Sequence, residues 1–220
     1  MKILCISDQI DPLVYSPYIK ERFADVDIIL SAGDLPLDYL DFIISSLNKP
    51  LLFVFGNHHT EDLKHYRKVW NSPFVESVID ESYFGCGAIH MGTKVKTEGN
   101  FIVAGLGGSM RYNNGDNQFS EFEMMFEVIK LIPRLLWNRV FHGRFLDILL
   151  THAPPKGIHD KHDKCHWGFK IYLWFMKVFK PRYLVHGHIH LYDLSDVRCT
   201  RWENTMVINA YSHYVIDHGE

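Results

Sequence analysis

The chain has 220 residues, of which 47% are hydrophobic and 22% are charged. These proportions are typical of a globular protein with a substantial core, and we predict a single domain over residues 1–220. The formal net charge of −3 argues against a long nucleic acid or an anionic membrane surface as the partner. No segment reaches the ~18 uninterrupted apolar residues of a membrane span. Cysteines without CxxC spacing, in a chain whose amino terminus reads as a strand and not as a signal peptide, favour the cytoplasm.

The first third of the chain alternates apolar runs with amphipathic segments. Strands are predicted over residues 2–7, 26–31 and 51–55, and helices over residues 17–24 and 36–47. Such alternation is typical of a sheet that helices cover.

The middle third is predicted to contain short strands within residues 74–104, with a turn at Gly99 and Asn100. A loop rich in Gly and Asn follows over residues 105–118. A helix is predicted over residues 119–139, capped by Ser120 with Glu123 three residues later. We expect Pro133 to kink or divide that helix.

The last third returns to the alternating pattern and contains a histidine-rich loop. The predicted elements are strands over residues 145–150, 182–186, 192–199 and 205–216, a helix over 167–179, and the loop over 153–166. The helix around Trp174 is expected to pack into the core, with a homo-oligomer interface as the alternative.

Polar residues that can bind metals stand where the apolar runs end. They are Asp8, Gly33–Asp34, Gly56–Asn57–His58, Thr151–His152 and the Gly-His-Ile-His segment that ends at His190. The carboxyl ends of strands are the usual place for sites in open α/β sheets. Carboxylates, a neutral amide and imidazoles together suit Zn, Mn or Fe. Each residue taken singly has a plainer role as a cap, a turn residue or a core histidine.

The whole series, in this order over residues 8–190, resembles the calcineurin-like metallophosphoesterase superfamily. The resemblance implies an α/β fold, a four-layer α/β/β/α sandwich of two mixed sheets flanked by helices. It also implies two divalent ions. Asp8 and His190 would bind the first, Asp34 would bridge, and Asn57, His152 and His188 would bind the second. His58 would contact the phosphoryl group and protonate the leaving group. A metal-activated hydroxide would then attack phosphorus in line.

The chain departs from the family pattern at two positions. Ile10 stands where a second histidine normally binds the first metal, so we expect a weaker first site; Asp11 could reach it through water. His59 stands where an acidic residue often follows the Asn-His pair. Glu61 or Asp62 could orient His58 instead.

Two further residues are candidates for substrate binding. Arg111 in the 105–118 loop could bind a phosphate, or could simply be exposed. His159 in the 153–166 loop could line the pocket. A separate metal site from His159, Asp160, His162 and His166 is a less favoured alternative to a solvated polar loop.

The leading hypothesis is a metal-dependent phosphoesterase that hydrolyses a phosphodiester or a phosphomonoester, with a small nucleotide-like substrate preferred. One alternative is a catalytically weakened scaffold of the same fold that binds a protein partner, for which Ile10 is the main support. Another is a hydrolase that uses one metal.

Overall fold

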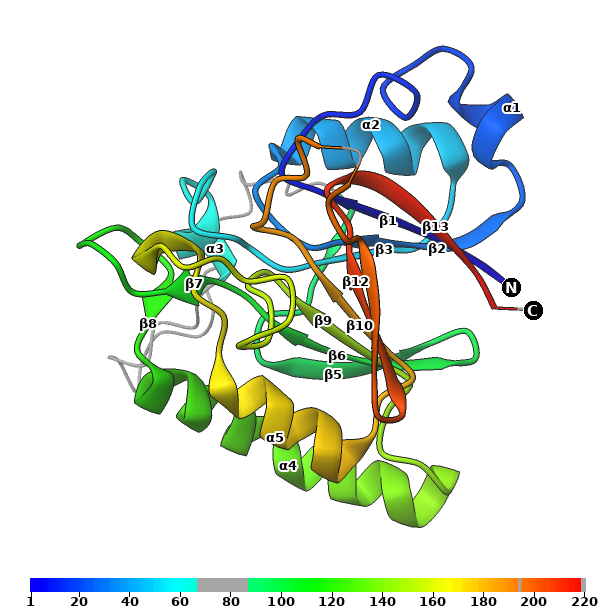
Figure 1. Cartoon of the computed structure of the whole chain (residues 1–220). Coiled ribbons are helices and arrows are strands. Elements are labelled where there is room, and N and C mark those ends of the chain that lie inside the picture. Colours follow the sequence, from blue (N-terminus) through cyan, green and yellow to red (C-terminus); the bar gives the residue numbers. More distant parts are fainter. Residues whose placement is uncertain (67–86, 194, 219–220) are drawn as a thin grey trace, which may run out of the picture.

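The structure is a computed structural model that describes residues 1–66, 87–193 and 195–218. Residues 74–86 of the predicted central strands therefore lie outside the described part of the chain. The described residues form two large sheets, one small one, and helices on the outer faces of the large sheets (Figure 1).

The first sheet has five strands in the order β13-β1-β2-β3-β4. Their bounds are β1 Lys2–Ser7, β2 Val26–Ser31, β3 Leu51–Phe53, β4 Ile89–His90 and β13 Ser212–Asp217. The strands β1 to β4 run parallel, and β13 pairs with β1 in the antiparallel sense. Parallel strands place their carboxyl ends at a common edge, which is where the loops that follow β1, β2 and β3 begin.

The second sheet has six strands in the order β11-β12-β10-β9-β6-β5. Their bounds are β5 Lys94–Glu98, β6 Phe101–Leu106, β9 Ile148–Thr151, β10 Tyr183–His186, β11 Cys199–Trp202 and β12 Thr205–Asn209. The inner strands β6, β9, β10 and β12 are parallel, and the edge strands β5 and β11 are antiparallel. A short pair, β7 Ser109–Met110 and β8 Gln118–Phe119, forms from the central loop.

Four layers result, because helices cover the outer face of each large sheet (Figure 1). The helices are α1 Ile19–Phe23, α2 Leu37–Leu47, α3 Leu63–Tyr66, α4 Glu121–His142 and α5 Lys170–Phe179, with a short 3₁₀ turn at Lys164–His166. The first two pack on the five-stranded sheet, and α4 and α5 pack on the six-stranded sheet. The predicted α/β/β/α sandwich is confirmed.

The side chains of β1 show how the sequence specifies these layers. Ile3 and Cys5 point into the core between the two sheets, whereas Leu4 and Ile6 point into the core beneath the helices. Successive strand residues face opposite sides, so a continuous apolar run is required when both sides are buried. All four side chains are fully buried.

Several predicted details are confirmed and others are not. Ser120 caps α4 in a capping box with Glu123, and Gly99 lies in the turn between β5 and β6 with φ +56°. Pro133 does not divide α4, which continues from Glu121 to His142 as one helix. The ring is exposed to solvent, and the helix tolerates the missing hydrogen bond within its long packed length. The strand predicted over 192–199 is wrong: of the described residues in that range only Cys199 lies in a strand, as the first residue of β11, while Arg198 donates hydrogen bonds to the backbone carbonyls of Asn209 and His213.

None of the helices in the described ranges combines the length and the apolar character that a membrane crossing requires.

Candidate metal centre

The candidate ligands come from five strand ends that belong to two different sheets. Asp8, Asp34 and Asn57 follow β1, β2 and β3 of the five-stranded sheet. His152 and the segment from His188 to His190 follow β9 and β10 of the six-stranded sheet. The structure brings all six predicted ligands into one network of contacts at the edge where the two sheets meet.

His152 is the centre of the first half of this network. Its Nε2 lies 3.3 Å from a carboxylate oxygen of Asp34 and 3.1 Å from the amide oxygen of Asn57. Its Nδ1 donates to the backbone carbonyl of Ala32 at 2.8 Å, which leaves the Nε2 lone pair free to act as a ligand. The His152 side chain is fully buried. Nε2 of His152, a carboxylate oxygen of Asp34 and the amide oxygen of Asn57 therefore lie close together.

His188 joins the second half of the network to the first. Ligand atoms of His188, His152 and Asp34 lie within 4.8 Å of one another. The Nε2–H of His188 donates to the carbonyl of Cys165 at 2.6 Å, so Nδ1 is the nitrogen left for a metal. The His188 backbone N–H donates to the two carboxylate oxygens of Asp8 at 3.0 and 2.9 Å. His190 Nε2 lies 3.7 Å from the same carboxylate.

Glycines let the ligand loops approach this closely. A Cβ on Gly56 would stand 2.0 Å from Oδ1 of Asp34, and one on Gly187 would stand 2.4 Å from Oδ2 of Asp8. Neither distance is compatible with a side chain. The ligands themselves are strained, since Asp8, Asp34 and His188 adopt φ values of +62°, +55° and +68°. Positive φ in residues other than glycine is uncommon and concentrates at functional sites.

The charges at this edge favour a bound cation. Burial opposes ionisation of His152, yet the charges of Asp34 and Asp8 and the hydrogen bonds with Asp34 and Ala32 raise its pKa to about 9. In the metal-free chain a proton on His152 therefore offsets the two buried carboxylates. Burial, followed by the charge of His152, lowers the pKa of His188 to about 4, so His188 is a neutral imidazole with a free lone pair.

The donor set fits divalent cations. It contains two carboxylates, one amide oxygen and three imidazoles, and the carboxylates bring negative charge that offsets part of the charge of a bound cation. Both carboxylate oxygens of Asp34 have partners at the site: Oδ2 lies 3.3 Å from Nε2 of His152, and Oδ1 accepts from the backbone N–H of His58 at 2.8 Å. The Asp8 and His190 side is the more open of the two, because His190 is 40% exposed and the exposed Ile10 side chain supplies no ligand there.

The contacts that could compensate for Ile10 and His59 are not formed among the described residues. Asp11 does not turn toward the metal centre, because its carboxylate is hydrogen-bonded to Ser212, His213 and the backbone N–H of Leu13. His58 is exposed, as a residue that meets substrate should be. Among the described residues, no hydrogen bond joins the imidazole of His58 to Glu61 or Asp62.

The two candidate substrate residues have other partners in this conformation. Arg111 forms an ion pair with Glu123 at 2.9 Å and also donates to the carbonyl of Gln118. Both ring nitrogens of His159 are engaged, Nδ1 with His186 and Nε2 with Thr200, each at 2.8 Å. The bonds of Arg111 all involve its Nη2 group, whereas both ring nitrogens of His159 are occupied, and their roles in substrate binding stay predictions.

The alternative second metal site in the 153–166 loop is not assembled from the residues predicted. Asp160 accepts hydrogen bonds from the backbone N–H groups of Gly157 and Gly168 and pairs with Lys156, so it braces the loop. His166 instead meets Asp163 and Cys165, and its ring lies 5.5 Å from that of His188. The turn from Asp163 to His166 therefore lies directly beside the metal centre.

Residues that orient the ligands were not found from the sequence. Tyr112 accepts a hydrogen bond from the amide of Asn57 at 3.2 Å, which directs the amide oxygen of Asn57 toward His152. Tyr192 contacts Nδ1 of His190 at 2.6 Å. The carbonyls of Ala32 and Cys165 fix the two buried imidazoles. The only sign of such an orienting residue in the sequence is its type, a tyrosine within a loop.

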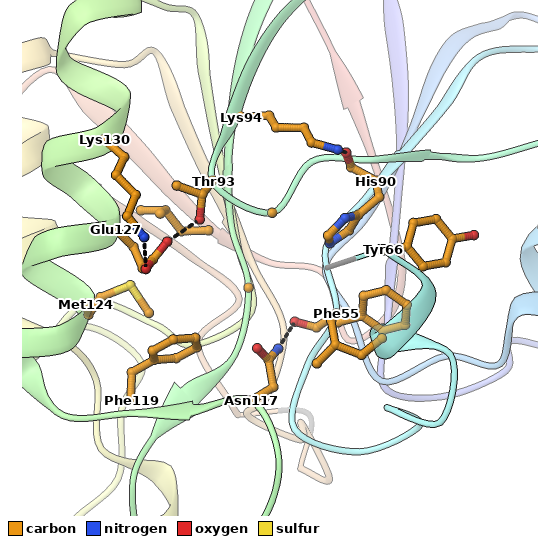
Figure 2. Close-up of a pocket in the computed structure, with 14 residues that line it drawn as sticks. Phe55, Tyr66, His90, Thr93, Lys94, Asn117, Phe119, Met124, Glu127 and Lys130 are labelled. Carbon is orange, nitrogen blue, oxygen red and sulfur yellow. Dashed lines mark hydrogen bonds and ion pairs between the residues drawn. The ribbon is translucent and has the colours of Figure 1, made fainter. Parts of the chain in front are cut away.

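A cavity of about 780 Å³ lies next to the loop that carries Asn57 (Figure 2). Phe55, His90, Phe119 and Met124 line it, and Asn117 donates to the carbonyls of Phe55 at 3.1 Å and of Gly56 at 2.7 Å. None of the six candidate metal ligands lines the cavity. The cavity is therefore separate from the metal centre, and Asn117 links the two by holding the loop between them.

A family model of calcineurin-like phosphoesterases matches residues 1–192 of the chain. The chain belongs to this family. The matched range contains all six candidate ligands, and metal-dependent hydrolysis of phosphate esters is the chemistry that the family supports. No curated protein matches the chain.

Solved structures share the phosphoesterase fold at low sequence identity. One crystal structure has a TM-score of 0.63 at 14% identity and covers 98% of this chain and 94% of its own. The crystal structure of TT1561 of Thermus thermophilus has a TM-score of 0.56 at 12% identity and covers 96% and 88%. A single mutant of Vps29 from Entamoeba histolytica has a TM-score of 0.40 at 14% identity and covers 96% and 73%. At such identities the first two similarities establish the fold alone.

Proposed function

We propose that this phosphoesterase-family protein is an active enzyme that binds two divalent ions and hydrolyses a small phosphate ester, with a nucleotide-like phosphodiester as the preferred class. The observation that carries the proposal is the convergence of Asp34, Asn57, His152 and His188 at the edge between the sheets. Lone pairs of the carboxylate, the amide oxygen and the imidazoles face one another there. A bound cation, or in its absence the proton on His152, offsets their mutual repulsion.

The protein side chains would divide the work in the following way. Asp8 and His190 would hold one Mn, Fe or Zn ion, Asn57, His152 and His188 would hold the other, and Asp34 would bridge them. The ions, when bound, supply Lewis acidity that activates water and neutralises charge on the phosphoryl group. His58, exposed beside the bridging carboxylate, would donate a hydrogen bond to a phosphoryl oxygen and a proton to the leaving group.

An aromatic rim beside His190 supports a substrate that carries a flat ring. The His190 ring lies 5.0 Å from the Tyr211 ring at an angle of 30°. Tyr192 is 79% exposed and hydrogen-bonded to His190. Base-stacking on exposed aromatic side chains stabilises bound nucleotides by about 1–3 kcal/mol per base. The aromatic rim is next to the candidate metal ligand His190. A nucleotide whose phosphate binds at the metal centre would have to place its base close to such a ligand.

The first experiment measures hydrolysis of bis-p-nitrophenyl phosphate by the metal-depleted protein with and without added Mn²⁺. We expect stimulation by the metal, and loss of activity in Asp34→Asn and His188→Ala. Asp41→Asn and His142→Ala are matched controls at exposed positions on α2 and α4, and they should retain activity. Equal turnover in the wild type and in both ligand variants would refute the proposal.

The aromatic rim is tested with two substrates that have the same leaving group. Tyr192→Ala should raise KM for the p-nitrophenyl ester of thymidine 5′-monophosphate by roughly tenfold, the cost of losing a stacking contact of ~1.4 kcal/mol. It should leave KM for p-nitrophenyl phosphate nearly unchanged. Tyr192→Phe keeps the ring and should keep the wild-type preference for the thymidine ester over p-nitrophenyl phosphate, although it removes the hydroxyl that contacts His190. A parallel rise with both substrates would argue for a role in metal binding.

Metal content separates the enzyme from its alternatives. Near two equivalents after loading favours the dinuclear enzyme, one implies that Ile10 has weakened the first site, and none favours the scaffold. If the first site is weak, Ile10→His should raise both metal content and activity. If Ile10→His changes neither metal content nor activity, residue 10 does not limit metal binding at the first site.

A further inference from the structure

The turn beside the metal centre carries a second cluster of side chains that can bind a metal. Among the residues that the structure describes, two groups of at least three such side chains bring their ligand atoms within 4.8 Å of one another. One is the group of Asp34 and the two buried histidines at the metal centre. The other consists of Asp163, Cys165 and His166, at the 3₁₀ turn Lys164–His166. It shares only His166 with the loop site considered from the sequence, and the proposed hydrolysis leaves its side chains without a role.

The three side chains of this turn meet at one carboxylate oxygen. The thiol of Cys165 donates to Oδ2 of Asp163 at 2.7 Å, and the Nδ1–H of His166 donates to the same oxygen. Sγ of Cys165 lies 3.5 Å from Nδ1 of His166. Both donated hydrogens therefore lie in the space between the three ligand atoms, where a cation bound by all three would lie.

The distances fit a small tetrahedral ion. Zinc binds cysteine sulfur at ~2.3 Å, histidine nitrogen at ~2.0–2.1 Å and carboxylate oxygen at ~2.0–2.2 Å, which places neighbouring ligand atoms ~3.5 Å apart. Sγ of Cys165 and Nδ1 of His166 already have this separation. Oδ2 of Asp163 would have to move ~0.8 Å away from the sulfur to reach it. The Asp163 side chain is free to do so, because it is 50% exposed.

The types of ligand select zinc among the common divalent ions. A cysteine thiolate is a soft ligand, which favours Zn²⁺ over Mg²⁺, Ca²⁺ and Mn²⁺. With Asp163 it would bring two negative charges, equal to the positive charge of the ion. Cys165 and His166 are partly exposed, so water can reach the fourth position. A sulfur ligand also distinguishes this cluster from the metal centre, whose six candidate ligands are oxygen and nitrogen donors.

Hydrogen bonds hold the turn in the shape that brings its side chains together. The backbone N–H of His166 donates to the carbonyl of Asp163 at 3.1 Å, and the N–H of Lys161 donates to the carbonyl of His166 at 3.2 Å. On the side of the metal centre, the Nε2–H of His188 donates to the carbonyl of Cys165 at 2.6 Å. Because these contacts already order the backbone, binding of an ion would lose less conformational entropy.

We propose that Asp163, Cys165 and His166 bind a single zinc ion, with water as the fourth ligand, at a site separate from the metal centre. The carbonyl of Cys165 belongs to both places, since it accepts from His188 while the thiol of the same residue binds the zinc. Zinc at the turn would therefore help to hold the imidazole of His188 in its orientation, as groups that contact metal ligands do.

The test is a titration of the metal-depleted full chain with Co²⁺ under reducing conditions. Cobalt replaces zinc in tetrahedral sites and reports a thiolate ligand through an intense charge-transfer band in the near ultraviolet. We expect this band in the wild type, its loss when excess Zn²⁺ is added, and little effect of Mn²⁺. Cys165→Ser should abolish the band. Cys199→Ser, the matched control at an exposed thiol, should keep it.

Two further variants separate this site from the metal centre. His166→Ala should weaken displacement of Co²⁺ by Zn²⁺ roughly tenfold or more, whereas His142→Ala, at an exposed position on α4, should not. Asp34→Asn disables the metal centre and should leave the cobalt–thiolate band unchanged, so this site and the proposed hydrolysis can fail independently. A wild type without the band, or a band that survives Cys165→Ser, would overturn the proposal.

Discussion

Gly56 shows how closely the backbone approaches the ligands. A Cβ there would stand 2.0 Å from Asp34 Oδ1 and 2.6 Å from Cε1 of His152. Gly56→Ala should therefore displace two ligands at once and weaken metal binding by roughly 10- to 100-fold, the range for disturbing the groups that orient ligands. Calorimetric titration with Mn²⁺ measures this. Gly87→Ala is the matched control, because its added methyl group meets only Ile44 at an ordinary 3.7 Å.

Asp11 holds the loop after β1 against the start of β13. Burial alone would raise the pKa of this carboxyl, but hydrogen bonds with Ser212, His213 and the Leu13 N–H hold its pKa below the ordinary value. A lowered pKa in the folded state gives stability that is present above the unfolded pKa of roughly 4 and lost as pH falls through the folded value.

Asp11→Asn should therefore lower the free energy of unfolding by about 1–3 kcal/mol at neutral pH. The difference from the wild type should shrink as the pH falls below the range in which Asp11 ionises. Urea unfolding at a series of pH values measures both effects. A difference that stays constant with pH would mean that the amide loses shape complementarity and not charge.

The sequence predicts the ligands better than the groups that orient them, for a physical reason. Asp34 and His152 are distinctive residue types that follow apolar runs, so their positions at strand ends can be inferred. Ala32 and Cys165 act through backbone carbonyls, which every residue has. Tyr112 reaches Asn57 across 55 residues of chain, and only the fold makes that contact.

At the scale of elements, α4 depends on its first turn. The Ser120 side chain accepts from the N–H of Glu123, and the Glu123 side chain bonds back to the Ser120 N–H. Ser120→Ala should lower the free energy of unfolding by about 1 kcal/mol, the usual cost of an N-cap. Chemical unfolding measures it, with Ser45→Ala on the exposed side of α2 as the control. An equal loss of unfolding free energy in both variants would show that the Ser120 cap does not stabilise α4.

Predicted elements agree with the structure where both faces of a strand are buried. The apolar runs of β1 and β2 have the predicted bounds, because most of their side chains are buried and the runs are therefore almost continuously apolar. Edge strands are harder to predict. Cys199–Trp202 has a mixed, half-exposed pattern, and its pairing with β12 is set by the sheet and not by local sequence.

At the scale of the whole molecule, a bound ion should stabilise the fold. An ion that binds only the native state adds about 2.7 kcal/mol at a hundred times its Kd. We expect the Tm of chelator-treated protein to rise with added Mn²⁺, and Asp34→Asn to lose most of that rise. The exposed Asp41→Asn variant should keep it. A Tm independent of metal would show that the native state binds no ion tightly.

The contact between His188 and Asp8 joins residues 180 positions apart, one from each large sheet. A metal ion held by both segments would close almost the whole chain into a loop, as a disulfide does, but reversibly. The two sheets could then separate only after the ion departs. The lifetime of the folded protein would be governed by the residence time of its metal, so slow metal release would confer kinetic resistance to unfolding even where the equilibrium gain is modest.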